Sequence, residues 1–576
     1  MPMTDAEGRD GLSDFCAIVL ASAITLIIRG YQFGQSNHTI YLLDALRLND
    51  PSLFKNDWFV THTYQYHFVF THLAALLDRL RILRPAFLVG YFILILAWQA
   101  AWLRLTKLLG GNRRAFMLSV VLFFLSAGGF GLGFYDFLQD SAMLPSNIAN
   151  MLMLWGLVLW IGGSVLSPAI LLGLAGLVHL NDAVVSVGLW LVLVLCEIVR
   201  PIDRNSSRPG MLAATLIVLC LCLANIIPAF LASQSRQHVM PLSEFVDLYV
   251  RLRHPHHYDP SSWPAGLWIS FFWPFPLAIA WICTAPRKPA LLRTFRVLII
   301  FCAVMLISLL AAGVWYINEA LIQMSLSRFS IYPKLLTCAM ASILLCRYTR
   351  RPIICWIVAA MAAGVWLLRN STISPLLRLN GYCIGFLLAF FLLAAFYEIY
   401  VSRSRRRPLI LAGLTIEAIA LLMTAWRHQG IGFQAIGPSA DSPAYLQVCE
   451  FARQHTPVDS VFLVPPDEES FRLVARRAIV INFKGVPQFD GELAQWRDRL
   501  CGVLHLPTLQ NLPHRFDAAL RAIGQRYAVL PTSILVQAAE SYGARYIVVP
   551  HPLHSAVAGR LIFENQQFYL YDLDGS

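Results

Sequence analysis

The sequence predicts a polytopic α-helical membrane protein with about 13 spanning helices, followed by a smaller C-terminal α/β domain. Composition is the first indication: of 576 residues, 57% are hydrophobic and only 14% are charged. An average soluble domain has roughly 45–50% apolar and about 25% charged residues. The mean hydropathy is +0.60, and the apolar residues gather in runs of about 20, the length that crosses a bilayer.

The apolar runs lie between Phe15 and Trp426. We place spans at residues 13–29, 85–106, 115–130, 146–162, 164–180, 182–199, 211–231, 264–284, 297–316, 331–346, 353–368, 381–400 and 409–426. The first run has an acidic N-terminal flank and no small-residue cleavage site, so we expect a retained anchor. Residues 66–80 are too polar for a span, and we expect a helix on the outer surface there.

Basic loops predict the orientation of these spans, because short positively charged loops stay in the cytoplasm. One set of alternate loops contains Arg104, Lys107, Arg113 and Arg114; Arg200, Arg204 and Arg208; Arg287, Lys288, Arg293 and Arg296; Arg347, Arg350 and Arg351; and Arg403 and Arg405–Arg407. We therefore expect residues 1–12 in the cytoplasm of a bacterial cell and a 13–426 domain in its inner membrane. Residues 30–84 form the first outer loop, and the C-terminus is periplasmic. The net charge of +12 then reflects topology rather than nucleic-acid binding.

The chain changes character after the last predicted span, over residues 427–576. Prolines punctuate a segment of ordinary charge density, and apolar runs shorten to strand length at 461–464, 478–481 and 546–549. Helical spacing covers 444–454 and 534–542, and a hairpin is expected over 561–571. These alternating elements predict a small periplasmic α/β domain.

Polar residues at membrane depth are expensive, so their placement is informative about function. They gather at the outer ends of the predicted spans and in the outer loops, at Asn37, His38, Asp44, Asp57, Asp136, Asp140, His179, Asp182 and Arg328. This distribution favours an enzyme that acts at the outer interface. A transporter would place acidic residues near the membrane midplane and is often built from two repeats.

The order of these features resembles the GT-C superfamily of integral-membrane glycosyltransferases, which use polyprenyl-phosphate-linked sugars. The local sequences Gln35–His38, Asn49–Phe54 and Asn56–Phe59 look like a bacterial branch of that superfamily, as do Phe471–Arg472, Asn482–Lys484 and Trp496–Arg499. The resemblance implies a sugar donor on a polyprenyl phosphate, membrane lipids as surroundings, and a glycan, lipid or protein acceptor. The alternatives are a transporter or flippase of lipid-linked glycans and a non-catalytic membrane assembly protein.

The resemblance also implies roles for individual residues. An acid of the first outer loop acts as general base or holds a metal, which points to Asp44 and Asp57 as catalytic residues. Arg328 would bind the carrier phosphate, and Asn37, His38, Asp136, Asp140, His179 and Asp182 would contribute to substrate binding. No tight Asp-Glu pair follows the first span, so dependence on a divalent cation such as Mg²⁺ or Mn²⁺ stays open.

Each candidate also has a simpler structural interpretation. Asp44 would serve equally to solvate one face of a loop helix, and Asp57 to cap the helix that follows it. Asp136 and Asp140 are spaced to share a helical face at the interface. The run His254–His257 could bind a metal in isolation, but prolines break helical ligand geometry, so we expect a solvated loop there. Phe471–Arg472 and Trp496–Arg497 could form an acceptor-binding surface, but we expect domain packing instead.

Overall fold

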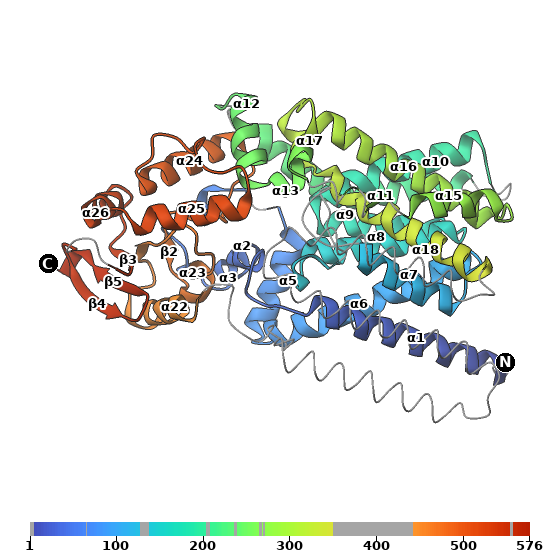
Figure 1. Cartoon of the computed structure of the whole chain (residues 1–576), viewed down its shortest axis with the longest axis horizontal. Helices are drawn as coiled ribbons and strands as arrows, with labels where there is room; N and C mark the ends of the chain where they lie inside the picture. The colour runs from blue at the N-terminus through green and yellow to red at the C-terminus, as the bar shows by residue number, and fades with distance from the viewer. Residues whose placement is uncertain are drawn as a thin grey trace.

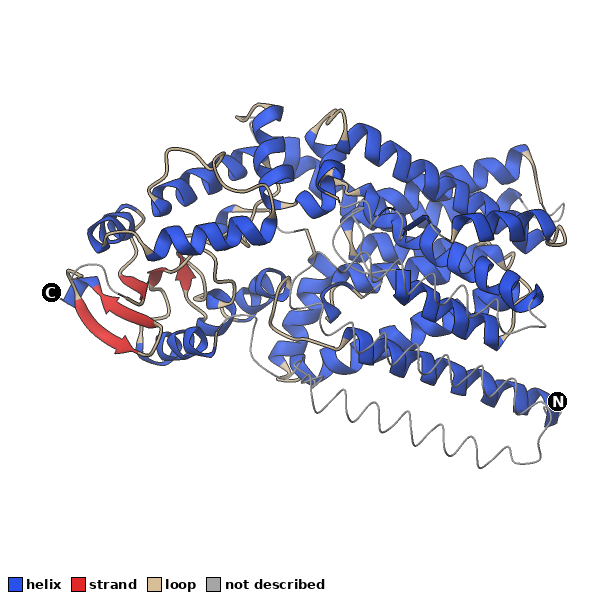
Figure 2. Cartoon of the chain, in the orientation of Figure 1, coloured by secondary structure: helices blue, strands red, loops and turns tan. Residues whose placement is uncertain are grey.

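The computed structural model describes residues 5–348 and 442–575, apart from residues 65, 127–137, 203–207, 235–238, 264–267, 269–270, 273 and 553–556. It consists of a helical bundle with a smaller mixed domain at one end (Figure 1). All strands of the described residues lie in that smaller domain, as Figure 2 shows.

The long helices of the bundle follow the apolar runs of the sequence. They are α1 (Asp5–Arg29), α6 (Leu83–Leu108), α7 (Arg113–Ser126), α8 (Pro145–Ile161), α9 (Leu166–Val178), α10 (Leu180–Val199), α11 (Arg208–Gln234), α15 (Phe275–Thr284), α16 (Pro289–Gly313) and α18 (Ile331–Tyr348). Each of the first ten predicted spans overlaps one of these helices, although α15 covers only the second half of the span predicted at 264–284. The spans predicted at 353–368, 381–400 and 409–426 lie outside the described residues.

Five stretches in the described part of the chain are long and apolar enough to cross a membrane. They are Leu83–Leu108, Leu180–Val199, Pro209–Gln234, Pro289–Gly313 and Glu319–Arg347, and Gly11–Leu26, Pro145–Ile161, Leu166–Val178 and Phe275–Thr284 are shorter apolar helices. Their outward faces expose large apolar side chains, including Leu216 and Ile307 at 54% and 53% exposure. Such faces are stable only against lipid, so the described helices confirm a multi-pass membrane protein.

Short helices occupy the loops at the end of the bundle that bears the mixed domain. They are α2 (His38–Tyr41), α3 (Leu43–Asn49), α4 (Trp58–His62), α5 (Phe68–Arg79), α12 (Leu242–Phe245), η2 (Val246–Arg253), α13 (Pro255–Tyr258), η3 (Pro260–Ser262), α17 (Glu319–Gln323) and η4 (Leu326–Ser330). Helix α5 is the helix expected over 66–80. Its 12 residues span about 18 Å, less than the roughly 30 Å hydrocarbon core.

The C-terminal domain contains a five-stranded mixed sheet of order β2-β1-β3-β5-β4. The strands are β1 (Val461–Leu463), β2 (Ala478–Ile479), β3 (Tyr546–Pro550), β4 (Arg560–Glu564) and β5 (Phe568–Asp572), and the helices are α22 (Pro443–His455), α23 (Phe471–Ala475), α24 (Asp490–Leu504), α25 (Phe516–Ala528) and α26 (Thr532–Ser541). The predicted strands, the predicted hairpin and the helices predicted over 444–454 and 534–542 are confirmed. Helices α23, α24 and α25 were not predicted.

Glycine allows close packing between the helices of the bundle. A Cβ atom on Gly176 of α9 would lie 2.5 Å from Cys222 Sγ and 2.7 Å from Ala183 Cα, so α9 approaches both α10 and α11 at this point. Nothing lies within 4 Å of a Cβ on Gly188 of α10. The two positions therefore differ in packing, although both are helical.

We expect Gly176→Ala to lower the thermal unfolding midpoint of the purified protein, because the added methyl must push the helices apart, at a typical cost of 1–3 kcal/mol. Gly188→Ala is the matched control and should leave the midpoint unchanged or raise it, since alanine favours a helix by about 1 kcal/mol. Equal midpoints for the two variants would contradict the packing described here.

Candidate functional site

Arg328 lies where the bundle meets the C-terminal domain, in the short helix η4. A small cavity beside it is lined by Ser146, Asn150, His179, Asn181, Asp182, Arg328 and Phe329. The volume of about 10 Å³ is that of one water molecule. The structure thus brings together three of the predicted site residues, His179, Asp182 and Arg328.

His179 and Asp182 form a hydrogen-bonded pair at the turn between α9 and α10. His179 ends α9 and precedes α10, so its side chain faces that of Asp182 one turn later, with Nδ1 2.7 Å from Oδ2. Both side chains are buried. The other oxygen of Asp182, Oδ1, has no hydrogen-bond partner among the described residues. An unpaired buried acceptor is costly, which makes Oδ1 available to a ligand hydroxyl.

His67 lies against this pair and was not singled out by the sequence. Its ring stacks on His179 with centroids 5.5 Å apart and contacts Tyr41 and Tyr66, each at 4.3 Å. Neither ring nitrogen has a hydrogen-bond partner within the part of the chain that the structure describes, although only 3% of the residue is exposed. Burial, together with His179 and Arg328, holds the pKa of His67 well below its ordinary value, so the ring is neutral.

The segment around α13 supplies a further cluster next to Arg328. The prediction of a solvated loop at 254–257 is wrong, because Pro255 begins a short helix that packs three histidine rings together. The His256 ring centroid lies 3.9 Å from that of His257 and 6.4 Å from that of His254. Burial, with Arg253, Lys484 and Arg328 nearby, lowers the pKa of His256 to about 3. These histidines are therefore neutral neighbours of several permanent cations.

A second group of predicted residues joins the first two outer loops. The backbone N–H of Asn37 donates to Asp140 Oδ2 at 3.4 Å. His38 is fully buried; Nδ1 accepts from Gly34 N at 3.0 Å, and Nε2 lies 2.9 Å from Met143 O. Asn37, His38 and Asp140 therefore hold the loops in place beside the site. Asp136 lies outside the described residues.

Asp44 occupies the half-buried face of α3, one helical turn after Tyr41. Burial raises the pKa of Asp44, while Arg47 opposes that shift. A carboxylate with a raised pKa has a stronger affinity for a proton, which suits a general base. Tyr41, which ends α2 and contacts His67, precedes Asp44 of α3 by three residues.

Asp57 has a different environment, because it is fully buried against the C-terminal domain. Its Oδ1 accepts from Val60 N at 3.1 Å, which caps α4, and Oδ2 accepts from Arg472 Nε at 2.7 Å and Ile479 N at 2.9 Å. Neither Asp57 nor Arg472 has more than 1% of its side chain exposed. A general base must reach an acceptor hydroxyl, so this geometry favours the capping interpretation of Asp57 and a role in domain docking.

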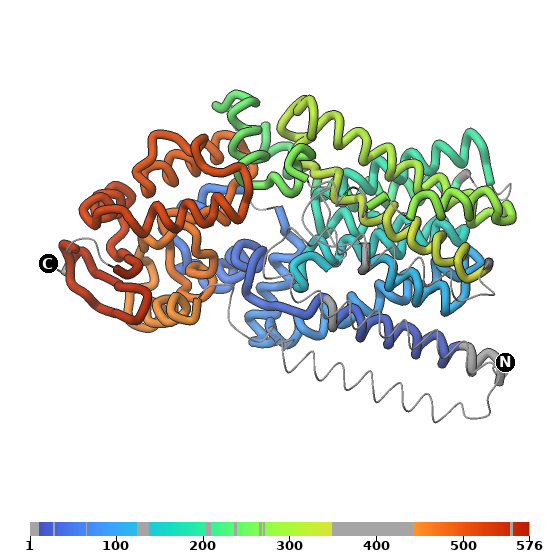
Figure 3. Tube along the Cα trace, viewed as in Figure 1, coloured from blue at the N-terminus to red at the C-terminus, as the bar shows by residue number. Residues whose placement is uncertain are grey.

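Residues 482–490, which we call the docking loop, extend this contact across the other outer segments. Arg253 donates to the carbonyls of Phe483 and Lys484 at 3.0 and 3.1 Å, and Tyr249 donates to Gln488 Oε1 at 2.8 Å. Lys484 Nζ donates to Ser36 Oγ at 3.1 Å. Figure 3 shows the blue segment that follows α1 lying against orange and red C-terminal residues. The docking loop therefore brings a further cation, Lys484, to the neighbourhood of Arg328.

A divalent cation needs three or more oxygen, nitrogen or sulfur ligands from the protein or its substrate. Among the described residues, no group of three or more His, Cys, Asp or Glu side chains is arranged to hold a metal ion.

The fold is that of two crystal structures of ArnT from Cupriavidus metallidurans. The structure bound to undecaprenyl phosphate matches with a TM-score of 0.51 and 14% identity over 97% of this chain and 97% of that chain. The apo structure matches with a TM-score of 0.50 and 14% identity over 99% and 98%. At 14% identity this likeness shows the fold alone, and the fold agrees with the GT-C resemblance of the sequence.

A family model described as a domain of unknown function (DUF6798) matches residues 443–503. This region contains β1, β2, Arg472 and the docking loop, the half of the C-terminal domain that contacts the bundle. No curated protein matches the chain.

We expect Arg472→Ala to loosen the C-terminal domain, because removing one partner of a buried ion pair typically costs about 3–5 kcal/mol. Limited proteolysis of the purified protein should then cut between bundle and domain, and the thermal midpoint should fall. Asp498→Ala is the control: this carboxylate pairs with Arg497 but its side chain is 64% exposed, and exposed pairs contribute only about 0–1 kcal/mol. Equal protease resistance of both variants would rule out the docking role.

Proposed function

We propose that the protein is a GT-C-type glycosyltransferase that moves a sugar from a polyprenyl-phosphate carrier to an acceptor on the outer face of a bacterial inner membrane. The observation that carries the proposal is the fold, which matches ArnT bound to undecaprenyl phosphate over 97% of the chain. The cluster around Arg328 supports it from the residues themselves, because it offers the groups that a phosphate-linked sugar requires.

Arg328 is the proposed binder of the carrier phosphate. A guanidinium can donate to two phosphate oxygens at once, and its charge stabilises the leaving group. The surrounding Tyr41, Tyr66 and His67 are uncharged, since burial raises the pKa of Tyr66 to about 12 and lowers that of His67. The cation is therefore not neutralised by these neighbours before the donor arrives.

His67 and Asp182 are the proposed partners of the sugar. The neutral imidazole of His67 has one N–H donor and one acceptor nitrogen, and Asp182 Oδ1 is an acceptor, all lacking hydrogen-bond partners among the described residues. Sugar hydroxyl groups are both donors and acceptors. The cavity has a volume of only about 10 Å³, so donor binding must move its lining apart.

Asp44 is the proposed general base. It accepts the proton of the acceptor hydroxyl while that oxygen attacks the anomeric carbon of the sugar. The bond between that carbon and the phosphate oxygen breaks, and its electron pair leaves with the polyprenyl phosphate, whose negative charge Arg328 offsets. A positioned base contributes about 10²–10⁴-fold to such a rate.

The binding test uses undecaprenyl phosphate and the purified protein in detergent. We expect Arg328→Ala to weaken binding by about tenfold or more. Arg328→Lys should weaken it less, because lysine keeps the charge but cannot donate two parallel hydrogen bonds to the phosphate. Arg251→Ala should bind as the wild type does, since Arg251 is exposed and paired with Asp247 at 2.7 Å. Unchanged binding by Arg328→Ala would show that another group holds the phosphate.

The catalytic test is glycan transfer in membranes that contain the lipid-linked donor pool. Asn keeps the shape of Asp44 but cannot accept the proton, so Asp44→Asn should lower transfer by about 10²-fold or more without weakening undecaprenyl phosphate binding. Asp57→Asn should instead lower the thermal midpoint together with activity. Full transfer by Asp44→Asn would reject this residue as the base.

The pH dependence of transfer separates a base from a structural carboxylate. Asp44 acts deprotonated, so the rate should rise with pH through its raised pKa. Arg47 lowers that pKa, and removing its charge in Arg47→Gln should move the acidic limb to higher pH. Arg79→Gln, in the same outer loop, should leave the profile in place. If the acidic limb of the pH–rate profile lies at the same pH in wild type and Arg47→Gln, Asp44 is not the general base.

The orientation is tested by fusing alkaline phosphatase or green fluorescent protein after Ser576. The Arg-rich loops predict a periplasmic C-terminus, so the phosphatase fusion should be active and the fluorescent fusion dark. The opposite pattern would place the site on the cytoplasmic side. Undecaprenyl phosphate binding without sugar transfer in any membrane preparation would favour a transporter of the carrier lipid.

A further inference from the structure

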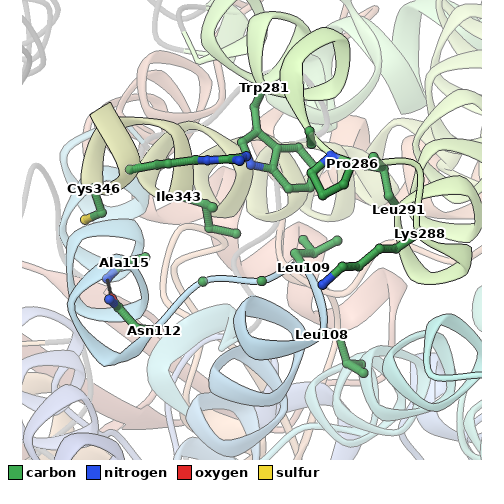
Figure 4. A pocket seen from close by; sticks show the side chains of 14 residues that line it. Leu108, Leu109, Asn112, Ala115, Trp281, Pro286, Lys288, Leu291, Ile343 and Cys346 are labelled. Carbon is green, nitrogen blue, oxygen red and sulfur yellow. Dashed lines mark hydrogen bonds between the residues drawn. The ribbon is translucent and has the colours of Figure 1, made fainter. Parts of the chain in front are cut away.

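A larger pocket lies at the opposite end of the bundle, far from Arg328. This distal pocket has a volume of about 360 Å³ and is lined by Leu108–Asn112, Ala115, Trp281, Ala285, Pro286, Lys288, Leu291, Ile343, Cys346 and Arg347. It lies between the turn from α6 to α7 and the ends of α15, α16 and α18 (Figure 4). Its size is within the range of about 300–1,000 Å³ that is usual for small-molecule sites.

The shape of the distal pocket comes from the turn that joins α6 to α7. Gly110 has a φ of +84°, and a Cβ on Gly111 would lie 2.7 Å from Ile343 Cγ1. The absence of side chains at these two positions lets the turn pass close to α18. The floor of the pocket is formed by the apolar side chains of Leu109, Trp281 and Ile343, all at least nine-tenths buried.

The charges at the distal pocket are unbalanced. Lys288 and Arg347 line it, no lining residue is acidic, and neither side chain has a hydrogen-bond or ion-pair partner among the described residues. Figure 4 shows the Lys288 side chain extending toward the pocket. These two cations therefore lack a described counter-ion.

Neighbouring basic side chains at the same end of the bundle are paired instead. Asp14 binds Lys107 and Arg113, and Glu197 binds Arg296 at 3.0 Å. Lys288 and Arg347 differ in this respect from Lys107, Arg113 and Arg296, whose charges a carboxylate offsets.

We propose that the distal pocket binds the phosphate headgroup of an anionic glycerophospholipid, with Lys288 and Arg347 on the phosphate and the apolar floor against the start of the acyl chains. The flanking helices expose Ile279 and Ile299, at 58% and 51%, to the region that lipid occupies. Basic pockets between the ends of spanning helices are suited to anionic headgroups. The site is separate from the Arg328 cluster and does not depend on the proposed transfer reaction.

The test measures binding of short-chain dioctanoyl phosphatidylglycerol to the purified full-length protein in detergent. We expect about fivefold weaker binding for Lys288→Gln or Arg347→Gln and about 30-fold weaker binding for the double variant. Each cation near an anionic lipid surface contributes separately to the binding free energy. Arg287→Gln is the matched control, because Arg287 is exposed next to Lys288 and does not line the pocket. All four variants replace exposed residues, and an unchanged thermal midpoint verifies their folding.

Two ligand controls distinguish the source of the phosphate. Dioctanoyl phosphatidylcholine, whose headgroup has no net charge, should bind weakly and with no difference between wild type and the double variant. Inorganic phosphate should bind weakly as well. Equal affinity for phosphatidylglycerol in wild type and the double variant would overturn the site, and inorganic phosphate binding as tightly as phosphatidylglycerol would overturn the lipid assignment.

Discussion

The ion pair between Asp57 and Arg472 is the constraint on which the end of the molecule that bears the C-terminal domain depends. It joins the first outer loop to the first half of the C-terminal domain, and both charges are withdrawn from water. Burying two charges costs desolvation free energy, and their attraction offsets this cost only when further hydrogen bonds satisfy the remaining donors and acceptors. Asp57 accepts hydrogen bonds from Val60 N and Ile479 N, and Arg472 donates to Asn482 Oδ1. The ion pair thereby holds α4, β2 and the docking loop together. The residues around Arg328 are positioned through the same contacts.

Both ends of the bundle contain buried ion pairs, and the end near the C-terminal domain also holds a cluster of neutral histidines and tyrosines. Near the C-terminal domain, histidines and tyrosines are packed so closely that burial keeps them neutral around permanent cations. At the far end, carboxylates such as Glu197 directly offset arginines. A neutral polar lining preserves the field of a cation for a ligand, while a carboxylate removes it. The distal pocket has no acidic lining residue beside Lys288 and Arg347, whereas Asp182 lines the cavity beside Arg328.

Most of the secondary structure could be predicted from local patterns, because apolar runs and strand-length segments are properties of neighbouring residues. From the sequence, His179, Asp182 and Arg328 could be assigned only to the same side of the membrane. Their proximity is visible only in the structure. Asp57 shows the limit: a helix cap and a catalytic acid have the same local sequence, and only Arg472, 415 positions later, distinguishes them. His67 was not singled out and the 254–257 histidines were expected in solvent, since polar loop residues usually face solvent, whereas tertiary packing brings these rings together.

The contact between Lys484 and Ser36 spans 448 positions of the chain, which has a consequence for biogenesis. At a synthesis rate of about 5–20 residues per second, Ser36 leaves the ribosome roughly 20–90 s before Lys484 does. The first outer loop must therefore persist for that time without its docking surface, with apolar side chains such as Trp58 and Phe59 uncovered. Nascent chains that stall before the docking loop would leave this surface exposed.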